Sequence, residues 1–537
     1  MAKRFGVMLD MSRNAVMKPE QVKEFAATIK KLGYNMIQLY TEDTYEIPEE
    51  PYFGYLRGRY SQAELKDMVA YCDSIGVELI PCIQTLAHLN QAFRWKPYSE
   101  ICDIADILLV GEERTYELIE NMFRSLRACY TTKYVHVGMD EAHHLGLGKY
   151  LDRHGFTNRF DILRQHLTRV IELAKKYDFT PIMWSDMFFR LANKGEYNIK
   201  DLSSITDEMI NACPEGVELV YWNYTQTEEE RYDIMFKAHA KFPGETWFGG
   251  GAWTWSGFAP NNRWTLESMI PAMESCHENN VNNIFMTMWG DDGGECSFWS
   301  VLPSLYAIRR HYDGVTDMEQ IKQEFYKLAG VDFDTMMLLD LPIHLGNPYR
   351  RNNSASKYML YNDVFLGLMD GALPLSGKQD FADMSHRLQE QVEKAGRFGY
   401  IFESLSALCK VVSIKYDLGE RARTAYKARD LEALKALVEE FRLLIPALED
   451  FAEKFRILWF TENKPHGFDI QENRLGGLLF RLCSQEKRLA GYVNGTIDRI
   501  PELEEEILPY CGLFCADANG DIPRLNYWGG STTVNRI

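Results

Sequence analysis

The sequence predicts an α/β protein in which a (β/α)8 TIM barrel is followed by a mostly helical C-terminal domain. Up to Arg310, eight short apolar runs alternate with amphipathic helical patterns. Polar and aromatic residues follow nearly every apolar run, as at the carboxyl ends of barrel strands. Beyond Arg310 the alternation stops, and long helical periodicities rich in Lys, Glu and Arg replace it.

The predicted strands cover residues 5–10, 34–40, 77–83, a run that starts at Tyr134, and then 179–184, 217–222, 246–251 and 283–289. Helical patterns separate them; Pro19 opens the first, and Ser61 with Glu64 forms a capping box for the second. Strands that alternate with helices require right-handed crossovers and a parallel sheet, and eight such units close into a barrel. An open doubly wound sheet is the alternative, but no glycine-rich phosphate fingerprint follows the first strand.

The predicted domains are a catalytic (β/α)8 barrel at residues 1–315, a connecting segment at 316–355 and an α-helical domain at 356–537. The connection is indicated by a stretch rich in turn-forming residues, with Pro342, Gly346 and Pro348.

Composition excludes several kinds of partner. A net charge of -18 argues against nucleic acid and anionic membranes, and no apolar run is long enough to cross a bilayer. No export signal is visible, and the 11 cysteines are odd in number and scattered, which favours a reduced, cytoplasmic protein. Cys511 and Cys515 have the spacing of a ligand pair, but no second pair lies nearby, so we expect no metal and no cofactor. A homodimer is one state that the sequence leaves open.

Acids, imidazoles and indoles gather at the predicted strand ends. Asp140 and Glu141 follow an apolar strand and precede a glycine-rich loop, which makes them the first candidates for acid-base chemistry. A cavity with indole walls and a few carboxylates suits a sugar, whose ring faces stack on aromatic rings. Simple packing is the better explanation for any single tryptophan, but less so for four or more strands that end in one. The residues at these ends are Asp43, His88, His136, Asp140, Glu141, Trp184, Asp186, Trp222, Trp253, Trp255, Trp289 and Asp291.

The segment His136-Val-Gly-Met-Asp140-Glu141 resembles the His-x-Gly-x-Asp-Glu signature of family-20 glycoside hydrolases, the β-N-acetylhexosaminidases. The flanking residues follow the family's order, with Asp43 after strand two, His88 after strand three, and Trp184, Trp222 and Trp289 in the positions of its pocket tryptophans. Asp291 stands where many members have Glu. The likeness covers roughly residues 1–310 and is to the members that lack an N-terminal α+β domain.

Two family positions differ. Phe5 occupies the place of an arginine that grips the sugar hydroxyls, and a segment near Trp253 replaces a Tyr-x-Asp motif that holds the acetamido oxygen. Both contacts are therefore unassigned.

The resemblance implies an exo-acting enzyme that removes terminal β-linked GlcNAc or GalNAc, with the substrate's own 2-acetamido group as nucleophile. Glu141 would be the general acid and then base, and Asp140 would orient the acetamido N–H. The three tryptophans would enclose the acetamido methyl, and Asp43 and His88 would form a supporting pair. His136 and Trp253 would also belong to the substrate pocket, and Asp291 would accept hydrogen bonds from sugar hydroxyls.

Two other functions compete with this one. His88, His136, Asp140, His144 and Asp186 are the ligand types of a metal-dependent barrel hydrolase, and Glu141-x-x-His144 has a spacing found in di-iron helices. A non-catalytic sugar-binding protein is the third reading, against which the intact Asp140 and Glu141 speak.

Overall fold

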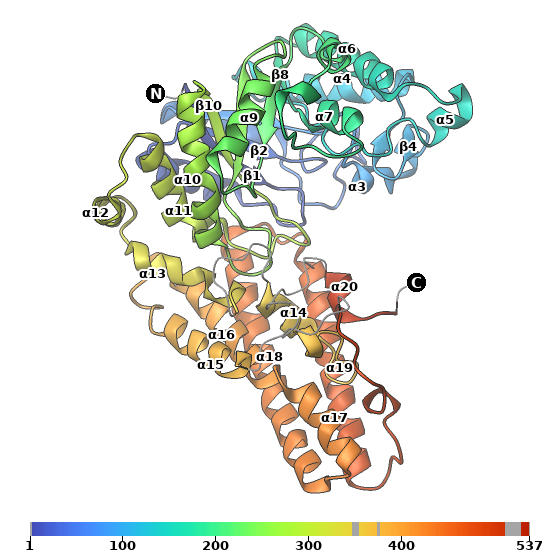
Figure 1. Cartoon of the computed structure of the whole chain (residues 1–537), viewed down its shortest axis with the longest axis vertical. Helices are drawn as coiled ribbons and strands as arrows, with labels where there is room; N and C mark the ends of the chain where they lie inside the picture. Colours follow the sequence, from blue (N-terminus) through green and yellow to red (C-terminus); the bar gives the residue numbers. More distant parts are fainter. Residues whose placement is uncertain (1–2, 346–353, 373–375, 511–527, 536–537) are drawn as a thin grey trace. The chain divides into compact units, whose positions relative to one another are not determined.

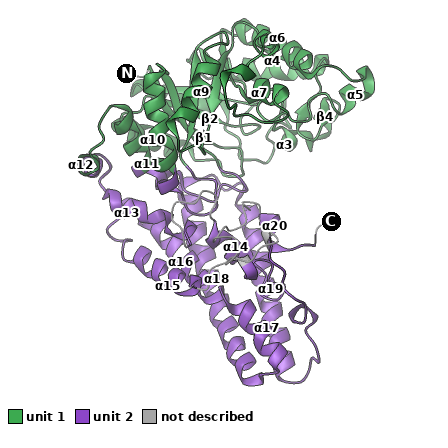
Figure 2. Ribbon diagram, in the orientation of Figure 1, with its two compact units in different colours: residues 1–252, 265–289, 304–321 green, residues 253–264, 290–303, 322–537 purple. Residues whose placement is uncertain are grey.

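The computed structural model describes residues 3–345, 354–372, 376–510 and 528–535 (Figure 1). The chain divides into two compact units, shown in green and purple in Figure 2. Unit 1 comprises Met1–Ala252, Thr265–Trp289 and Ser304–Ile321, and unit 2 comprises Trp253–Trp264, Gly290–Pro303 and Lys322–Ile537. The division differs from the predicted domains because two segments that follow β9 and β10, residues 253–264 and 290–303, group with the C-terminal part of the chain.

Unit 1 is built on a closed barrel of eight parallel strands, which confirms the predicted fold class. Their order around the barrel is β1-β10-β9-β8-β7-β6-β3-β2. Consecutive barrel strands are therefore neighbours, and the last strand closes on the first. The strands are β1 (Arg4–Asp10), β2 (Met36–Tyr40), β3 (Glu78–Cys82), β6 (Tyr134–His136), β7 (Thr180–Trp184), β8 (Glu218–Trp222), β9 (Thr246–Gly251) and β10 (Asn283–Met288).

The helices of unit 1 follow the predicted alternation. Pro19 is the first residue of α1 (Pro19–Lys31), where its fixed φ and missing N–H carry no penalty. The capping box predicted from Ser61 and Glu64 is present at the start of α2 (Gln62–Ser74). The other helices between barrel strands are α4 (Glu113–Arg127), α6 (Arg159–Lys176), α7 (Asp186–Ala192), α8 (Asp207–Ala212), α9 (Glu229–His239) and α10 (Asn262–Glu278).

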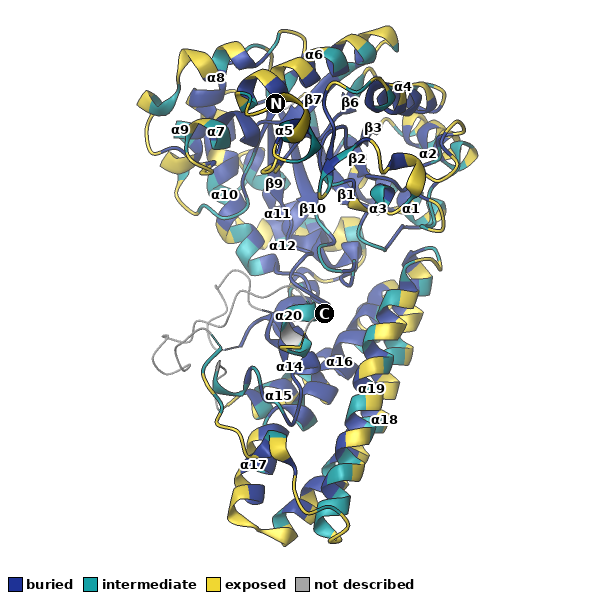
Figure 3. Ribbon diagram, turned by 90° about the vertical axis from the view of Figure 1, so that its right-hand side faces the viewer, coloured by how far each residue is buried: buried dark blue, intermediate teal, exposed yellow. Residues whose placement is uncertain are grey.

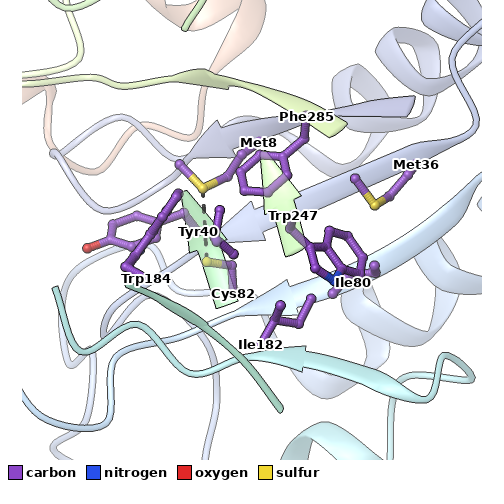
Figure 4. Close-up of a cluster of buried hydrophobic side chains, with 10 residues drawn as sticks. Met8, Met36, Tyr40, Ile80, Cys82, Ile182, Trp184, Trp247 and Phe285 are labelled. Carbon is purple, nitrogen blue, oxygen red and sulfur yellow. Dashed lines mark hydrogen bonds between the residues drawn. The ribbon is translucent and has the colours of Figure 1, made fainter. Parts of the chain in front are cut away.

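The barrel interior is packed with side chains from several strands. Figure 4 shows Met8, Cys82, Trp184, Trp247 and Phe285 meeting inside it, with other members of the same buried cluster around them. Every residue of β2 and β10 is buried, as expected for parallel strands that have the barrel core on one face and helices on the other, and the barrel strands are dark blue in Figure 3.

The connection from β3 to β6 carries additional structure. It contains a short helix α3 (Asn90–Phe93) and an antiparallel ribbon of β4 (Cys102–Ile104) and β5 (Ile107–Leu108) before α4 begins. After β6, a loop leads to α5 (Lys149–His154). These insertions lie on the same side of the strands as the predicted site residues, since both follow the carboxyl ends of strands.

Unit 2 is helical, as predicted. Its longest helices are α18 (Leu431–Glu462) and α19 (Phe468–Val493), whose buried residues recur along one stripe while the rest is half-buried or exposed (Figure 3). The predicted connecting segment is largely helical itself and includes α12 (Met318–Ala329) and α13 (Phe333–Met337), while residues 346–353 lie outside the described residues. The remaining helices are α14 (Ala355–Tyr361), α15 (Gly377–Gln389), α16 (Gly399–Lys415), α17 (Leu418–Ala428) and α20 (Trp528–Thr532).

The sequence predicts no membrane span and no disulfide scaffold, and the structure bears on both for the described residues. No helix in the described ranges is long and apolar enough to cross a membrane. The nine cysteines within them are free thiols, and Cys511 and Cys515 lie outside them.

Candidate active site

The loop after β6 carries Asp140 and Glu141 in an unusual backbone conformation. Gly138, Met139 and Glu141 all have positive φ, at 72°, 71° and 52°. A residue with a Cβ costs about 1–3 kcal/mol in such a conformation, and strain of this kind concentrates at functional sites. His88 (φ 56°) and Glu42 (φ 44°), which follow β3 and β2, share the feature. These strained positions thus follow the ends of three neighbouring strands, β2, β3 and β6.

Asp140 is held by two side chains from the loop after β3. Gln84 Nε2 donates to Asp140 Oδ1 at 2.7 Å, and His88 Nε2 lies 3.2 Å from Asp140 Oδ2. Gln84 Nε2 also donates to the Tyr40 hydroxyl, while its Oε1 accepts from the Met139 N–H at 3.1 Å. One glutamine therefore fixes both the side chain of Asp140 and the backbone before it.

The electrostatics of this contact favour an ionised Asp140. Burial acts to raise the pKa of Asp140, but His88 and Gln84 outweigh it and hold that pKa below its usual value. Burial acts to lower the pKa of His88, and the Asp140 carboxylate reverses this and raises it to about 10. At neutral pH the pair is therefore an imidazolium beside a carboxylate.

Glu141 is in contact with two residues of α7. Its backbone N–H donates to Asp186 Oδ2 at 3.1 Å, and its Oε1 lies 3.7 Å from Arg190 Nη2. Arg190 Nε also donates to Asp186 Oδ2, at 2.9 Å. The Glu141 side chain is 42% exposed, whereas that of Asp140 is 11% exposed. Of the two adjacent acids, one is therefore enclosed and the other faces open space.

The predicted pocket tryptophans of unit 1 lie together at the same end of the barrel. Trp222 and Trp289 pack against the buried cluster that contains Trp184, and the Trp184 and Trp289 rings are 6.0 Å apart. Tyr40 meets Trp289 edge to face at 4.8 Å. The structure thus brings together three indoles from the ends of three different strands, β7, β8 and β10.

Tyr224 belongs to this aromatic group, although the sequence did not single it out. Its ring stacks on Trp222 at 5.3 Å, and its hydroxyl accepts from Trp289 Nε1 at 3.1 Å. Burial raises the pKa of Tyr224 well above its ordinary value, and the negative charges of Asp140 and Glu141 add to this rise. The phenol is therefore neutral and close to both carboxylates.

A charged cluster lies beside His88 at the ends of β1 and β2. Arg13 Nη2 is 3.3 Å from Glu42 Oε1 and its Nε is 3.8 Å from Asp10 Oδ2. Tyr40 donates its hydroxyl hydrogen to Glu42 at 3.0 Å. Burial raises the pKa of Glu42 against the opposing charges of Arg13 and His88. This cluster joins the Asp140 network through Tyr40 and Gln84.

Two predicted site residues have surroundings other than those expected. The pair predicted between Asp43 and His88 is not formed, because Asp43 Oδ1 accepts from Arg57 Nε at 3.2 Å while His88 contacts Asp140. His136 is fully buried beneath Trp184, with ring centroids 4.5 Å apart, and its Nδ1 accepts from the Gly138 N–H. Burial lowers the pKa of His136 to about 3, so it is neutral.

Trp253 and Asp291 belong to unit 2. Trp253 stacks on Trp255 at 4.3 Å, and both are buried. In the loop that carries Asp291, the neighbouring Asp292 and Glu295 accept from Lys357 Nζ at 2.9 and 2.6 Å. The predicted roles of Trp253 and Asp291 in sugar binding stay predictions.

The metal-dependent alternative requires several of these ligand side chains to converge on one point. Among residues 3–345, 354–372, 376–510 and 528–535, no group of three or more His, Cys, Asp or Glu side chains is arranged to hold a metal ion. His136 and His88 in particular contact different partners.

Five residues of this site were not predicted: Arg13, Glu42, Gln84, Arg190 and Tyr224. Each lies within six residues after the end of a barrel strand. Reading every polar residue after a strand end would have found them.

Comparison with known families agrees with the signature. Residues 5–234 match the catalytic domain of glycosyl hydrolase family 20, and residues 332–519 match the glycoside hydrolase 20C C-terminal domain. A probable beta-hexosaminidase of Arthroderma benhamiae is 23% identical over 311 residues, which are 48% of this chain and 49% of that protein. Hexosaminidase D of Bos taurus is 25% identical over 235 residues, 41% of this chain and 62% of its own length. The chain thus matches less than two thirds of each of these relatives.

Among solved structures, a β-N-acetylhexosaminidase of Bacteroides fragilis aligns with a TM-score of 0.48 and 19% identity, covering 62% of this chain and 71% of its own. The two family models, one for the barrel region and one for the helical region, follow each other along most of the sequence. The chain therefore belongs to glycoside hydrolase family 20.

Proposed function

We propose that this protein is an exo-acting β-N-acetylhexosaminidase that removes terminal β-linked GlcNAc or GalNAc with retention of configuration, by substrate-assisted catalysis. The observation that carries the proposal is the pair Asp140 and Glu141, adjacent in sequence at one strand end and different in environment. A conventional retaining glycosidase needs two carboxyl groups on opposite sides of the bond, and adjacent residues are poorly placed for that. Family 20 is a known exception, in which the substrate supplies the nucleophile.

In the proposed first step, the acetamido oxygen of the substrate forms a bond to C1 while the bond from C1 to the aglycone oxygen breaks. Glu141 donates its proton to the departing oxygen, and the product is a cyclic oxazolinium-type intermediate. Asp140, ionised beside His88, accepts the acetamido N–H and stabilises the positive charge that develops on the ring. In the second step Glu141 removes a proton from water, which attacks C1 and reopens the ring.

Trp184, Trp222 and Trp289 provide an apolar floor for the acetamido methyl in this proposal. The Tyr224 hydroxyl is the group we assign to the acetamido oxygen, because it is a neutral phenol near both carboxylates and is itself held by Trp289. Tyr224, which follows β8, thereby takes over the contact to the acetamido oxygen that the family's Tyr-x-Asp motif makes after the seventh strand.

The hydroxyl groups of the sugar are assigned to the cluster of Asp10, Arg13 and Glu42. Arg13 supplies donors and Glu42 acceptors at the ends of β1 and β2, next to the Asp140 network. Arg13 thereby replaces the arginine that the family carries at the position of Phe5. Substituting Glu42 with Gln should raise KM more than it lowers kcat, because the contact exists in the ground state as well as in the transition state.

The direct test is hydrolysis of an aryl β-N-acetylglucosaminide by the wild type and by Glu141→Gln. We expect the wild type to turn over and the variant to lose on the order of 10²–10⁴ in rate, the usual contribution of general acid-base catalysis. Substrates whose acetamido group carries one, two or three fluorine atoms should react progressively more slowly, because fluorine weakens the carbonyl nucleophile. A thiazoline mimic of the cyclised intermediate should inhibit strongly.

Three outcomes would contradict the proposal. A wild type that binds the sugar without hydrolysing it is a sugar-binding protein. Activity that chelators abolish and zinc or manganese restores belongs to a metal-dependent hydrolase. Rates that do not respond to fluorination indicate a nucleophile supplied by the protein.

A cytoplasmic location is part of the proposal and is supported by the nine described cysteines, all of them free thiols. Fractionation of the producing cells tests it.

A further inference from the structure

Asp186 and Arg190 form an ion pair that touches Glu141 at two different points. They occupy the first and fifth positions of α7, the helix that follows β7. Asp186 is fully buried, and the Arg190 side chain is 18% exposed. An acid and an arginine four residues apart are common on helices and contribute little when exposed. This pair differs because both members reach a neighbouring loop that carries a candidate general acid.

Asp186 acts on the backbone of Glu141. Its Oδ2 accepts the Glu141 N–H at 3.1 Å, in a loop where Met139 and Glu141 both have positive φ. A strained conformation persists only when surrounding contacts determine it. Asp186 supplies such a contact, and its carboxyl group is fully buried and shielded from water. The direction in which the Glu141 side chain leaves the loop therefore depends on Asp186.

Arg190 acts on the carboxyl group of Glu141. Its Nη2 is 3.7 Å from Glu141 Oε1, while its Nε donates to Asp186 and its Nη1 donates to the Gly195 carbonyl at 2.9 Å. The guanidinium lies 5.8 Å from the ring centre of Trp222. Three of its contacts thus fix Arg190 between the aromatic pocket and Glu141. The 3.7 Å between Arg190 Nη2 and Glu141 Oε1 is longer than a hydrogen bond, so the two side chains have room to approach each other.

We propose that Asp186 and Arg190 are positioning residues for Glu141, a role that rests on the proposed function. Asp186 holds the strained backbone, and Arg190 steers the carboxyl group and stabilises the carboxylate that remains after Glu141 has given its proton to the aglycone oxygen. The pair therefore increases the rate most for substrates whose leaving group must be protonated by Glu141 as it departs.

The dependence on the leaving group separates this role from a merely structural one. An alkoxide leaving group such as a sugar needs full protonation, whereas 2,4-dinitrophenolate leaves without it. We expect Arg190→Gln to lower kcat/KM about 100-fold for chitobiose and less than about 5-fold for 2,4-dinitrophenyl β-N-acetylglucosaminide. Arg190→Lys should recover part of the loss on chitobiose, because it keeps the positive charge without the planar fork.

Asp186→Asn is the second variant, since it removes the charge and keeps an oxygen that can accept the Glu141 N–H. Its loss should show the same dependence on the leaving group and be smaller than that of Arg190→Gln. The matched control is Arg309→Gln, which removes an arginine that is 15% exposed and paired with Asp313 four residues later on the outer surface of the barrel. That variant should keep wild-type kcat/KM on both substrates.

Equal losses on both substrates, or no loss on chitobiose in a folded Arg190→Gln protein, would falsify the positioning role. A wild type that is inert on both substrates would instead refute the proposed function, so the two failures can be told apart. Circular dichroism and the melting temperature of each variant establish that it is folded.

Discussion

His88 Nε2 lies 3.2 Å from Asp140 Oδ2, so the loop after β3 places a cation beside the acid that we propose orients the acetamido group. The other oxygen of Asp140 accepts from Gln84 in the same loop. Two residues from one loop therefore define the direction of the carboxylate and its charge. Asp43, which the sequence suggested as the partner of His88, is instead bonded to Arg57.

The His88 contact predicts a pH-dependent contribution to stability. The pKa of His88 rises from 6.5 to about 10 in the folded protein, so its stabilisation is complete below about pH 6.5 and is lost as the pH rises through 10. The lowered pKa of Asp140 makes its own contribution present above its unfolded value of 3.8 and lost in more acidic solution. The difference in unfolding free energy between wild type and His88→Gln should be largest between about pH 4 and 6.5 and shrink towards pH 10.

Urea unfolding at several pH values measures this difference. His154→Gln, at an exposed histidine at the end of α5, is the control and should differ from wild type by less than about 0.5 kcal/mol throughout. A constant difference between pH 5 and pH 10 would mean that His88 is not charged in the folded state.

Removing the hydroxyl of Tyr224 should impair catalysis without disturbing the fold. Tyr224→Phe keeps the ring that stacks on Trp222 and loses the oxygen that accepts from Trp289. Loss of a preorganised hydrogen-bond donor to the reacting group should lower kcat about 10–100-fold. The control is Tyr232→Phe, a buried tyrosine whose hydroxyl donates to two backbone carbonyls, those of Gln226 and Ser268. It should change stability but leave kcat near wild type, and equal kcat values for the two variants would refute the role of Tyr224.

Gly249 on β9 allows Trp184 to occupy its place in the pocket floor. A Cβ at this position would lie 2.9 Å from Trp184 and 3.4 Å from Phe285, both of them rigid buried rings. Gly249→Ala should therefore destabilise the protein by about 1–3 kcal/mol and raise KM by displacing the indole.

Gly477→Ala is the control for Gly249→Ala, and calorimetry measures the stability of both variants. Gly477 is an exposed residue inside α19, and a Cβ there meets no atom within 4 Å. Alanine should raise stability by about 0.5–1 kcal/mol because it has the higher helix propensity. A Gly249→Ala protein as stable as wild type would show that the barrel floor can repack.

Glu462 in unit 2 predicts a second pH effect, of opposite sign to that of Asp140. Burial raises its pKa to about 7, although Ser297 and Tyr400 donate hydrogen bonds to it. Folding therefore favours its protonated form, and its contribution to stability decreases as the pH rises from about 4.5 to 7. Glu462→Gln should remove this dependence, gaining up to about 3 kcal/mol relative to wild type between pH 5 and pH 7.5. Parallel pH profiles of the melting temperatures for the two proteins would contradict the assignment.

The strands and helices of unit 1 were predictable because each one repeats a local pattern. Apolar runs of six or seven residues mark most of the strands, and the predicted run of residues 246–251 has the bounds of β9, Thr246–Gly251. The Ser61 capping box is likewise readable from four residues. The predicted run from Tyr134 continues beyond β6, which ends at His136, because the backbone turns into positive φ at Gly138.

The order of the chain by itself determined the barrel, the helical C-terminal part and the position of Asp140 and Glu141 at a strand end. Strand and helix periods are local, and closure of eight parallel units follows from the handedness of their connections. Only the tertiary structure decided which side chains meet there. Gln84 and His88 contact Asp140, and Arg190 contacts Glu141. Tyr224 accepts a hydrogen bond from Trp289, and Asp43 pairs with Arg57 rather than with His88. These partners come from different strand ends, and a contact between them depends on barrel register and loop direction, which no local pattern of residues encodes.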